Sequence, residues 1–215
     1  MDLGRVQRAA VGCFARKGFA ATGIRELGAA VGLNSATLYH YVGSKQELLV
    51  EIMRRCLETM IEQGRAACAA ATTPTGQLAG LVASHVGFTA TNPLSCRVAE
   101  HELRALEPPV RAEMQALRDH YEQLFTDVLQ RGAQQGDFHA TDLGLARLAI
   151  MEMSTGVAHW YRPDGRKSLT EVQHAFVAMS YALLGVDADP HSILPAPPPP
   201  VRLASEPTDE LSDQG

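Results

Sequence analysis

Hydrogen-bonding side chains gather on one short predicted helix near the N-terminus. Residues 35–41 read Ser-Ala-Thr-Leu-Tyr-His-Tyr, so hydroxyl, phenol and imidazole groups occupy the exposed positions while Leu38 points the other way. Such groups form hydrogen bonds with base edges and phosphate oxygens. The chemistry that this pattern favours is recognition of a nucleic acid.

Signals for catalysis or metal binding are weaker. Glu100, His101 and Glu102 together suggest metal ligands, but the zinc motif H-E-x-x-H fails because Ala105 occupies its last position. The chain also lacks G-x-S-x-G, a P-loop and G-x-G-x-x-G. The four cysteines are scattered without a C-x-x-C pair, and we interpret them as small apolar residues. We therefore predict no enzyme, no catalytic residue, no metal site and no cofactor.

The residues around 35–41 have the pattern of a helix-turn-helix. Ile24, Leu27 and Val31 lie at helical spacing, and Gly32 follows as a left-handed stop. Asn34 or Ser35 can then cap the next helix. A short polar helix held by an apolar helix and a glycine turn is typical of a DNA-reading motif. An ordinary helical hairpin inside a globular core is the alternative.

Charge is distributed unevenly along the chain. The net charge of the whole sequence is −5, which by itself does not suggest a nucleic-acid partner. Residues 1–55, however, contain eight basic and four acidic side chains, whereas the remaining 160 residues contain eleven basic and twenty acidic ones. This asymmetry favours an anion-binding N-terminal part on a body that does not bind anions.

The remainder of the chain predicts further helices. Sustained period-two alternation is absent, so we expect an all-α protein of about nine helices. We expect three domains: a three-helix head over 1–50, a helical body for ligand binding and dimerisation over 51–185, and a disordered, proline-rich acidic tail over 186–215. The tail could alternatively supply a proline-rich ligand for a partner domain. Without a signal peptide or an apolar run of about 18 residues, we expect a cytoplasmic protein with no membrane partner.

Residues 5–52 resemble the DNA-binding domain of the tetracycline-repressor (TetR-like) family. The resemblance rests on Gly18-Phe19, Thr22, Arg25-Glu26-Leu27, Val31-Gly32-Leu33, Thr37 to Tyr41, Ser44-Lys45 and Glu47-Leu48-Leu49. Two positions depart from the family pattern. Gly23 stands where a capping Ser or Thr is usual, and Val42 stands where Phe is usual. Glycine costs a helix N-cap only a few tenths of a kcal/mol, and valine leaves a smaller apolar plug.

The resemblance implies a homodimer that places two copies of residues 35–41 in successive major grooves of an operator. Arg25 would reach a guanine edge or a phosphate, and Lys45 would hold a phosphate near the start of the fourth helix. Tyr39 could instead pack internally, Ser35 could be only a cap, and Lys45 could be a solvated charge. The expected DNA contacts are Arg25, Asn34, Ser35, Thr37, Tyr39, His40, Tyr41 and Lys45.

The family also implies a dimer built from the last two long helices, expected here at 142–161 and 169–184. Small residues on these helices allow close helix approach, although the two helices could instead close a monomer core. The family commonly binds an inducer within the body. The candidate lining residues are His85, Phe88, Arg97, Arg104, Tyr121, Phe125, Met151, Trp160 and Arg162.

The nature of the inducer is suggested by residues 159–165, His-Trp-Tyr-Arg-Pro-Asp-Gly, followed by Ser168 and Glu171. This stretch resembles a TetR-like subgroup that controls fatty-acid or steroid breakdown and responds to acyl-coenzyme A thioesters. Arg97, Arg104 and Arg162 would then bind the coenzyme phosphates, while a salt bridge within the dimer is the alternative for Arg162. A repressor that responds to several drugs or aromatic ligands and controls an efflux or catabolic gene is the competing hypothesis.

Overall fold

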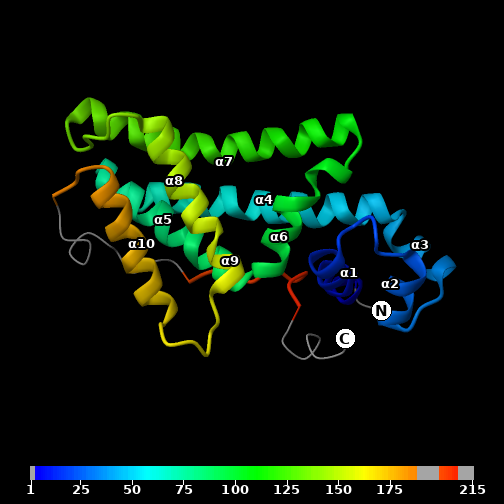
Figure 1. Ribbon diagram of the computed structural model, residues 1–215. Helices are drawn as coiled ribbons and strands as arrows, with labels where there is room; N and C mark the ends of the chain where they lie inside the picture. The colour runs from blue at the N-terminus through cyan, green and yellow to red at the C-terminus, as the bar shows by residue number, and fades with distance from the viewer. Residues whose placement is uncertain (1–2, 188–198, 208–215) are drawn as a thin grey trace. The chain divides into compact units, whose positions relative to one another are not determined.

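The computed structural model describes residues 3–187 and 199–207 (Figure 1), and within these ranges it contains helices and turns but no strand. The predicted all-α fold is confirmed. The described residues form ten α-helices and one 3-10 helix, η1, rather than about nine. Their bounds are α1 (Leu3–Lys17), α2 (Ile24–Val31), α3 (Ser35–Val42), α4 (Lys45–Ala69), α5 (Pro74–Thr91), α6 (Pro93–His101), η1 (Glu102–Ala105), α7 (Pro108–Gln135), α8 (Leu143–Thr155), α9 (Val157–Trp160) and α10 (Leu169–Leu183).

The larger helix count arises where expected single helices are interrupted. The helix expected over 142–161 is split into α8 and α9 at Gly156, a residue that forms helices poorly. The helix expected over 94–106 changes to the tighter 3-10 geometry after His101, as often happens at the end of an α-helix. No helix in the described ranges is both long and apolar enough to cross a bilayer.

The chain forms two compact units, whose boundaries differ from those expected at residues 50 and 185. Of the described residues, 3–58, 92–117 and 202–207 belong to unit 1, and 59–91, 118–187 and 199–201 belong to unit 2. The head expected over 1–50 therefore lacks two segments that fold with it. Val98, Leu106 and Met114 lie in the same buried core as Phe14, which explains why residues 92–117 belong to unit 1.

Unit 1 is built around a core that α1 to α4 share. Phe14 from α1 and Leu38 from α3 are buried in it together with a block of apolar residues from α4. Figure 1 shows α1, α2 and α3 gathered at the blue end of the chain. Because Leu38 is the one residue of α3 that is fully buried, it fixes which face of this short helix points outward.

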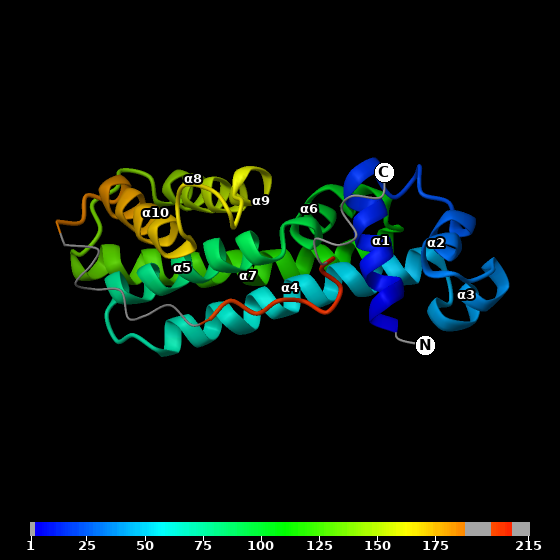
Figure 2. The same ribbon diagram turned by 90° about the horizontal axis from the view of Figure 1, so that it is seen from below.

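Unit 2 is organised around α5. Every residue from Leu78 to Ala90 is buried, so this part of the helix is enclosed on all sides, as expected of a helix surrounded by others. α8 and α10 pack against it, and the three lie side by side in Figures 1 and 2. Two long-range hydrogen bonds hold α10: Gln173 Nε2 donates to the carbonyl oxygen of Ala83 at 2.8 Å, and the Tyr181 hydroxyl donates to that of Thr75 at 2.8 Å.

The expected disordered tail over 186–215 is wrong for part of its length. Leu203, Ser205, Glu206 and Pro207 are buried, because they lie against unit 1 through specific hydrogen bonds described below. Most of the proline-rich run 195–200 lies outside the described residues. The prediction of disorder came from the low apolar content of this region, which implies little buried surface. Composition cannot show that the region forms hydrogen bonds with residues elsewhere in the chain.

Candidate nucleic-acid interface and effector site

The turn between α2 and α3 is held by backbone geometry. Gly32 adopts the left-handed conformation with φ 73° and ψ 29°, and the Leu33 amide donates to the Gly28 carbonyl at 2.8 Å. A Cβ on Gly28 would lie only 2.6 Å from the carbonyl oxygen of Leu33, so α2 approaches the turn as closely as glycine allows. The sequence indicated the stop at Gly32, but it did not indicate this requirement at Gly28.

The start of α3 is capped by Asn34. Its Oδ1 accepts a hydrogen bond from the Thr37 amide at 2.9 Å, which settles the choice between Asn34 and Ser35. The preceding helix lacks such a cap, since Gly23 at its N-cap forms no side-chain hydrogen bond. The capping role does not prevent Asn34 from contacting DNA, because its side chain is exposed.

The outer face of α3 carries the predicted reading residues. Tyr39 is 46% exposed and Tyr41 is 44% exposed, so neither is buried in the core. His40 is exposed beside Tyr41, with the two ring centroids 6.0 Å apart. Ser35 and Thr37 are half-buried, and Arg25 is exposed near the start of α2. A row of polar groups above the buried Leu38 therefore faces outward, as binding to a groove of DNA requires.

Lys45 has an internal role that the sequence did not predict. Its Nζ donates to the carbonyl oxygens of Phe19 and Thr22, both at 2.9 Å, and lies 4.1 Å from the centroid of the Phe19 ring. Two of the three ammonium donors are thus used to hold the loop between α1 and α2. The third N–H group of Lys45 is the one that could bind a phosphate. The alternative, in which the Lys45 ammonium is only a solvated charge, is wrong.

Ser44 and Glu47 at the start of α4 form only half of a capping box. Ser44 Oγ accepts a hydrogen bond from the Glu47 amide at 3.0 Å. The Ser44 amide, however, donates to the Val42 carbonyl at 2.8 Å rather than to Glu47. A complete capping box begins α10, where Ser168 and Glu171 exchange both hydrogen bonds.

Three of the predicted ligand-binding residues meet inside unit 2. The His85 ring centroid lies 5.5 Å from that of Tyr121 and 6.2 Å from that of Phe125, and the latter two are 5.7 Å apart. His85 Nε2 lies 3.1 Å from the hydroxyl oxygen of Thr155. Phe88 is buried on the same helix as His85. We use the name His85 cluster for His85, Tyr121, Phe125 and Thr155, together with the buried Thr89, which lies one turn after His85 on α5.

The His85 cluster contains polar atoms that are buried without a partner. His85 Nδ1 and Thr89 Oγ1 have none, although an unpaired buried polar atom is costly. Burial lowers the pKa of His85 from 6.5 to about 4, so the imidazole is neutral at pH 7. The sequence analysis did not identify Thr89 or Thr155. For Thr89 a signal was available, because it follows His85 by four residues on the same predicted helix.

The other predicted ligand residues are not brought into this cluster. Met151 is half-buried on α8. Trp160 is 51% exposed and stacks on Phe176, with centroids 6.2 Å apart. Arg162 is exposed and donates to the neighbouring Tyr161 carbonyl at 2.8 Å. Arg97 and Arg104 belong to unit 1, where Arg97 donates to the Ala15 carbonyl at 2.9 Å and Arg104 is exposed.

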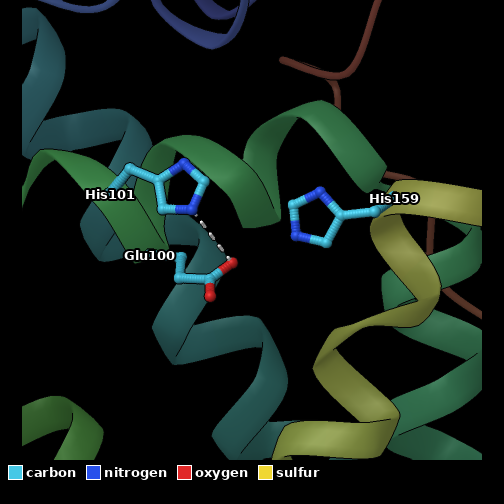
Figure 3. Close-up of side chains that lie close together, drawn as sticks. All are labelled: Glu100, His101 and His159. Carbon is cyan, nitrogen blue, oxygen red and sulfur yellow. Dashed lines mark ion pairs between the residues drawn. The ribbon is translucent and has the colours of Figure 1, made fainter.

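The acidic and histidine residues 100–102 do not act together. Figure 3 shows Glu100 and His101 close to each other, with His101 Nε2 3.7 Å from a Glu100 carboxylate oxygen. Glu102 has a separate role, because its Oε1 accepts a hydrogen bond from the Phe19 amide at 3.0 Å. His159, also drawn in Figure 3, belongs to unit 2. Of these three residues, Glu102 therefore helps to fix the loop after α1.

A helix-turn-helix with an exposed polar second helix, joined to a helical unit with a buried polar cluster, defines the class of DNA-binding transcriptional regulators. Residues 7–52 match the family described as bacterial regulatory proteins, tetR family, and residues 71–184 match the tetracyclin repressor-like, C-terminal domain. The chain belongs to the TetR family.

Individual relatives support the same assignment. The chain is 26% identical over 181 residues to the HTH-type transcriptional repressor KstR2 of Rhodococcus jostii, covering 83% of this chain and 87% of that protein. The structure of the TetR-family regulator PfmR from Thermus thermophilus is 30% identical, with a TM-score of 0.74 over 86% of this chain and 99% of that one. The structure of AibR with isovaleryl coenzyme A and operator DNA shares the fold, with 22% identity and a TM-score of 0.72 over 81% and 95% of the two chains.

The buried imidazole predicts a specific pH dependence of stability. Since the pKa of His85 is depressed in the folded state, the unfolded chain takes up a proton that the folded chain refuses as the pH falls from 6.5 to about 4. Stability should therefore be lost across this window, by on the order of 3 kcal/mol for this one group. In His85→Gln this part of the loss should be absent in denaturant unfolding measured from pH 7 to 4.

The control for this measurement is His139→Gln, which replaces an exposed histidine in the same unit. The control should keep the wild-type pH profile. An unchanged profile in His85→Gln would contradict the assignment of a neutral, buried imidazole.

Proposed function

We propose that this TetR-family protein is a transcriptional repressor that binds a palindromic operator as a homodimer and is released by an acyl-coenzyme A thioester. The DNA-binding part is carried by one observation: the polar face of α3 is exposed above a single buried anchor, Leu38. The relationship to KstR2, a transcriptional repressor, supports repression as the outcome.

Base reading is assigned to Arg25 and His40, and the remaining polar groups of α3 are assigned to phosphate or base contacts. Both side chains are exposed, and both can hydrogen bond to base edges in the major groove. Lys45 would contribute a phosphate contact through its remaining donor while holding the loop after α1. Asn34 and Ser35 lie at the N-terminus of α3, where amide groups and the helix dipole favour a phosphate.

Substitution of His40 tests the reading role. His40→Ala should weaken binding to the operator by ~1–3 kcal/mol and reduce the preference for operator over scrambled duplex, because a base-reading contact carries sequence information. Binding is measured by fluorescence anisotropy with both duplexes at fixed salt. His139→Ala, which removes an exposed histidine of unit 2, should leave both affinities unchanged. Equal losses on both duplexes in His40→Ala would assign His40 to phosphate contacts instead.

The dimer is assigned to α8 and α10, whose outer faces carry unusually exposed apolar residues. Leu145 and Leu148 on α8 are 65% and 50% exposed, and Met179 and Leu183 on α10 are 46% and 45% exposed. Ala149 on α8 and Ala175 and Ala182 on α10 are also exposed. An apolar surface of this kind is typical of a buried interface. Two readers must be about 34 Å apart to match half-sites one helical turn apart, which a symmetric dimer can provide.

Leu148→Glu should convert the dimer to a monomer, because it places a charge in an apolar interface. Sedimentation equilibrium measures the mass, and operator binding should fall with it. Leu3→Glu introduces the same change at an exposed leucine of α1 and should remain dimeric. A dimeric Leu148→Glu protein would reject this interface.

The effector is assigned to the interior of unit 2 around the His85 cluster. A neutral His85 Nδ1 and the Thr89 hydroxyl supply unsatisfied polar atoms within apolar and aromatic surroundings, which suits one carbonyl group on an apolar chain. The AibR structure contains isovaleryl coenzyme A, which makes a thioester the preferred ligand class. Of the three arginines expected to bind phosphates, Arg162 is the one exposed within unit 2. The ligand would act by binding one body conformation better than another.

Release of the protein–operator complex tests the effector. Isovaleryl coenzyme A and longer acyl-coenzyme A compounds should release operator DNA, whereas free coenzyme A should not. His85→Leu should raise the thioester concentration needed for half release by about tenfold, since it removes one hydrogen bond to the ligand. Release by hydrophobic cations or aromatic compounds, with none by any thioester, would favour the multidrug alternative that the aromatic rings of the cluster suggest.

A further inference from the structure

A short C-terminal segment is seated on unit 1. Residues 202–207, which we call the C-terminal strap, pack beside α1 and α6 and are drawn in red in Figure 2. Leu203 is buried, and the side chain of Glu206 is only 3% exposed. The Glu206 amide donates to the Leu203 carbonyl at 3.0 Å, so the strap closes into a turn. Arg202 stabilises this turn by donating to the Pro207 carbonyl at 2.7 Å.

Glu206 caps α6 from a distant part of the chain. Its two carboxylate oxygens accept hydrogen bonds from the amides of Leu94 and Ser95, both at 2.9 Å. These amides belong to the first turn of α6, where they have no partner within the helix and where the helix dipole favours negative charge. The N-cap residue itself, Asn92, makes no side-chain cap. Instead, its Oδ1 accepts from the Leu203 amide of the strap at 2.7 Å.

The strap also binds α1. Arg8 Nη1 donates to the Ala204 carbonyl at 3.0 Å, so the strap contacts both helices at once. α6 already holds α1 through the bond from Arg97 to the Ala15 carbonyl, and η1 holds the loop after α1 through Glu102 and the Phe19 amide. The strap therefore adds to an existing set of contacts that position the loop leading into α2.

The buried carboxylate of Glu206 depends on its hydrogen bonds with α6. Burial raises the pKa of this carboxyl, while its hydrogen bonds from the Leu94 and Ser95 amides and the charge of Arg202 lower it. An unpaired carboxylate would not be buried here, and the two α6 amides make the position favourable. A segment without the acid would leave the Leu94 and Ser95 amides without this partner.

We propose that the face formed by α1 and the start of α6 is a docking site for the acidic segment Leu-Ala-Ser-Glu-Pro, and that the docked strap is a detachable clamp that strengthens operator binding. The described residues of the strap form no hydrogen bond with α3, so the clamp acts through the contacts that support this helix. When the strap detaches, α6 loses the Glu206 cap and α1 loses the hydrogen bond between Arg8 and the Ala204 carbonyl. The effect on operator binding rests on the proposed function, whereas the docking itself does not.

The experiment compares the full chain with a protein truncated after Val201. Amide hydrogen exchange at Leu94 and Ser95 should be at least about tenfold faster in the truncated protein, because their acceptor is gone. A synthetic peptide of residues 199–215 added in excess should restore the slow exchange. The same peptide with Glu206→Ala is the matched control and should not restore it. Glu206→Ala in the full chain should reproduce the truncated exchange.

Operator affinity is measured on the same five samples: the full chain, the truncated protein alone, the truncated protein with each of the two peptides, and the full chain with Glu206→Ala. The truncated protein should bind operator several-fold more weakly, and the wild-type peptide should recover the loss. Unchanged exchange at Leu94 and Ser95 after truncation would overturn the docking site. If the Leu94 and Ser95 amides exchanged faster in the truncated protein but operator affinity did not change, the proposed effect of the strap on operator binding would be wrong. Failure of the full chain to bind any operator would count against the proposed function, while the exchange comparison would still decide the docking.

Discussion

The close approach of α2 to the turn that follows it is the constraint on which the position of α3 depends. The Leu33 carbonyl lies where a side chain on Gly28 would otherwise be, and the left-handed Gly32 turns the chain between them. With the turn so tight, α3 can bury Leu38 and still present its polar residues outward. Lys45 and Glu102 then fix the loop before α2 by binding its backbone. The reading helix is short, and its orientation comes almost entirely from these neighbours.

The helix-turn-helix could be predicted from sequence because its signals are local. Helical spacing in α2, a glycine stop and a capping residue each lie within a few positions of the structure that they determine. The role of Lys45 could not be predicted in this way. A lysine at the start of a helix after a basic head suggests a phosphate contact, but its two carbonyl partners more than twenty residues earlier become visible only in the folded chain.

The body illustrates a different limit of sequence reasoning. The residues proposed for a ligand were chosen by type, and only His85, Tyr121 and Phe125 were found together, because the face that each residue presents depends on how its helix is rotated. The prediction of a disordered C-terminal region, which was based on its composition, was also wrong for residues 203–207. Few apolar residues imply little burial on average, but Glu206 is held by two amides of α6, which is a polar reason for order.

The strap also has a consequence for biosynthesis. Glu206 follows every residue that it binds, so α6 lacks this cap while the earlier part of the chain is being translated. Unit 1 therefore acquires its last stabilising contacts only after unit 2 has been synthesised, although its first helices emerge at the outset. In a nascent chain, α3 would be packed on helices that still lack the contacts of the strap with α6 and α1. Unit 1 would be complete only after the last strap residues had been synthesised.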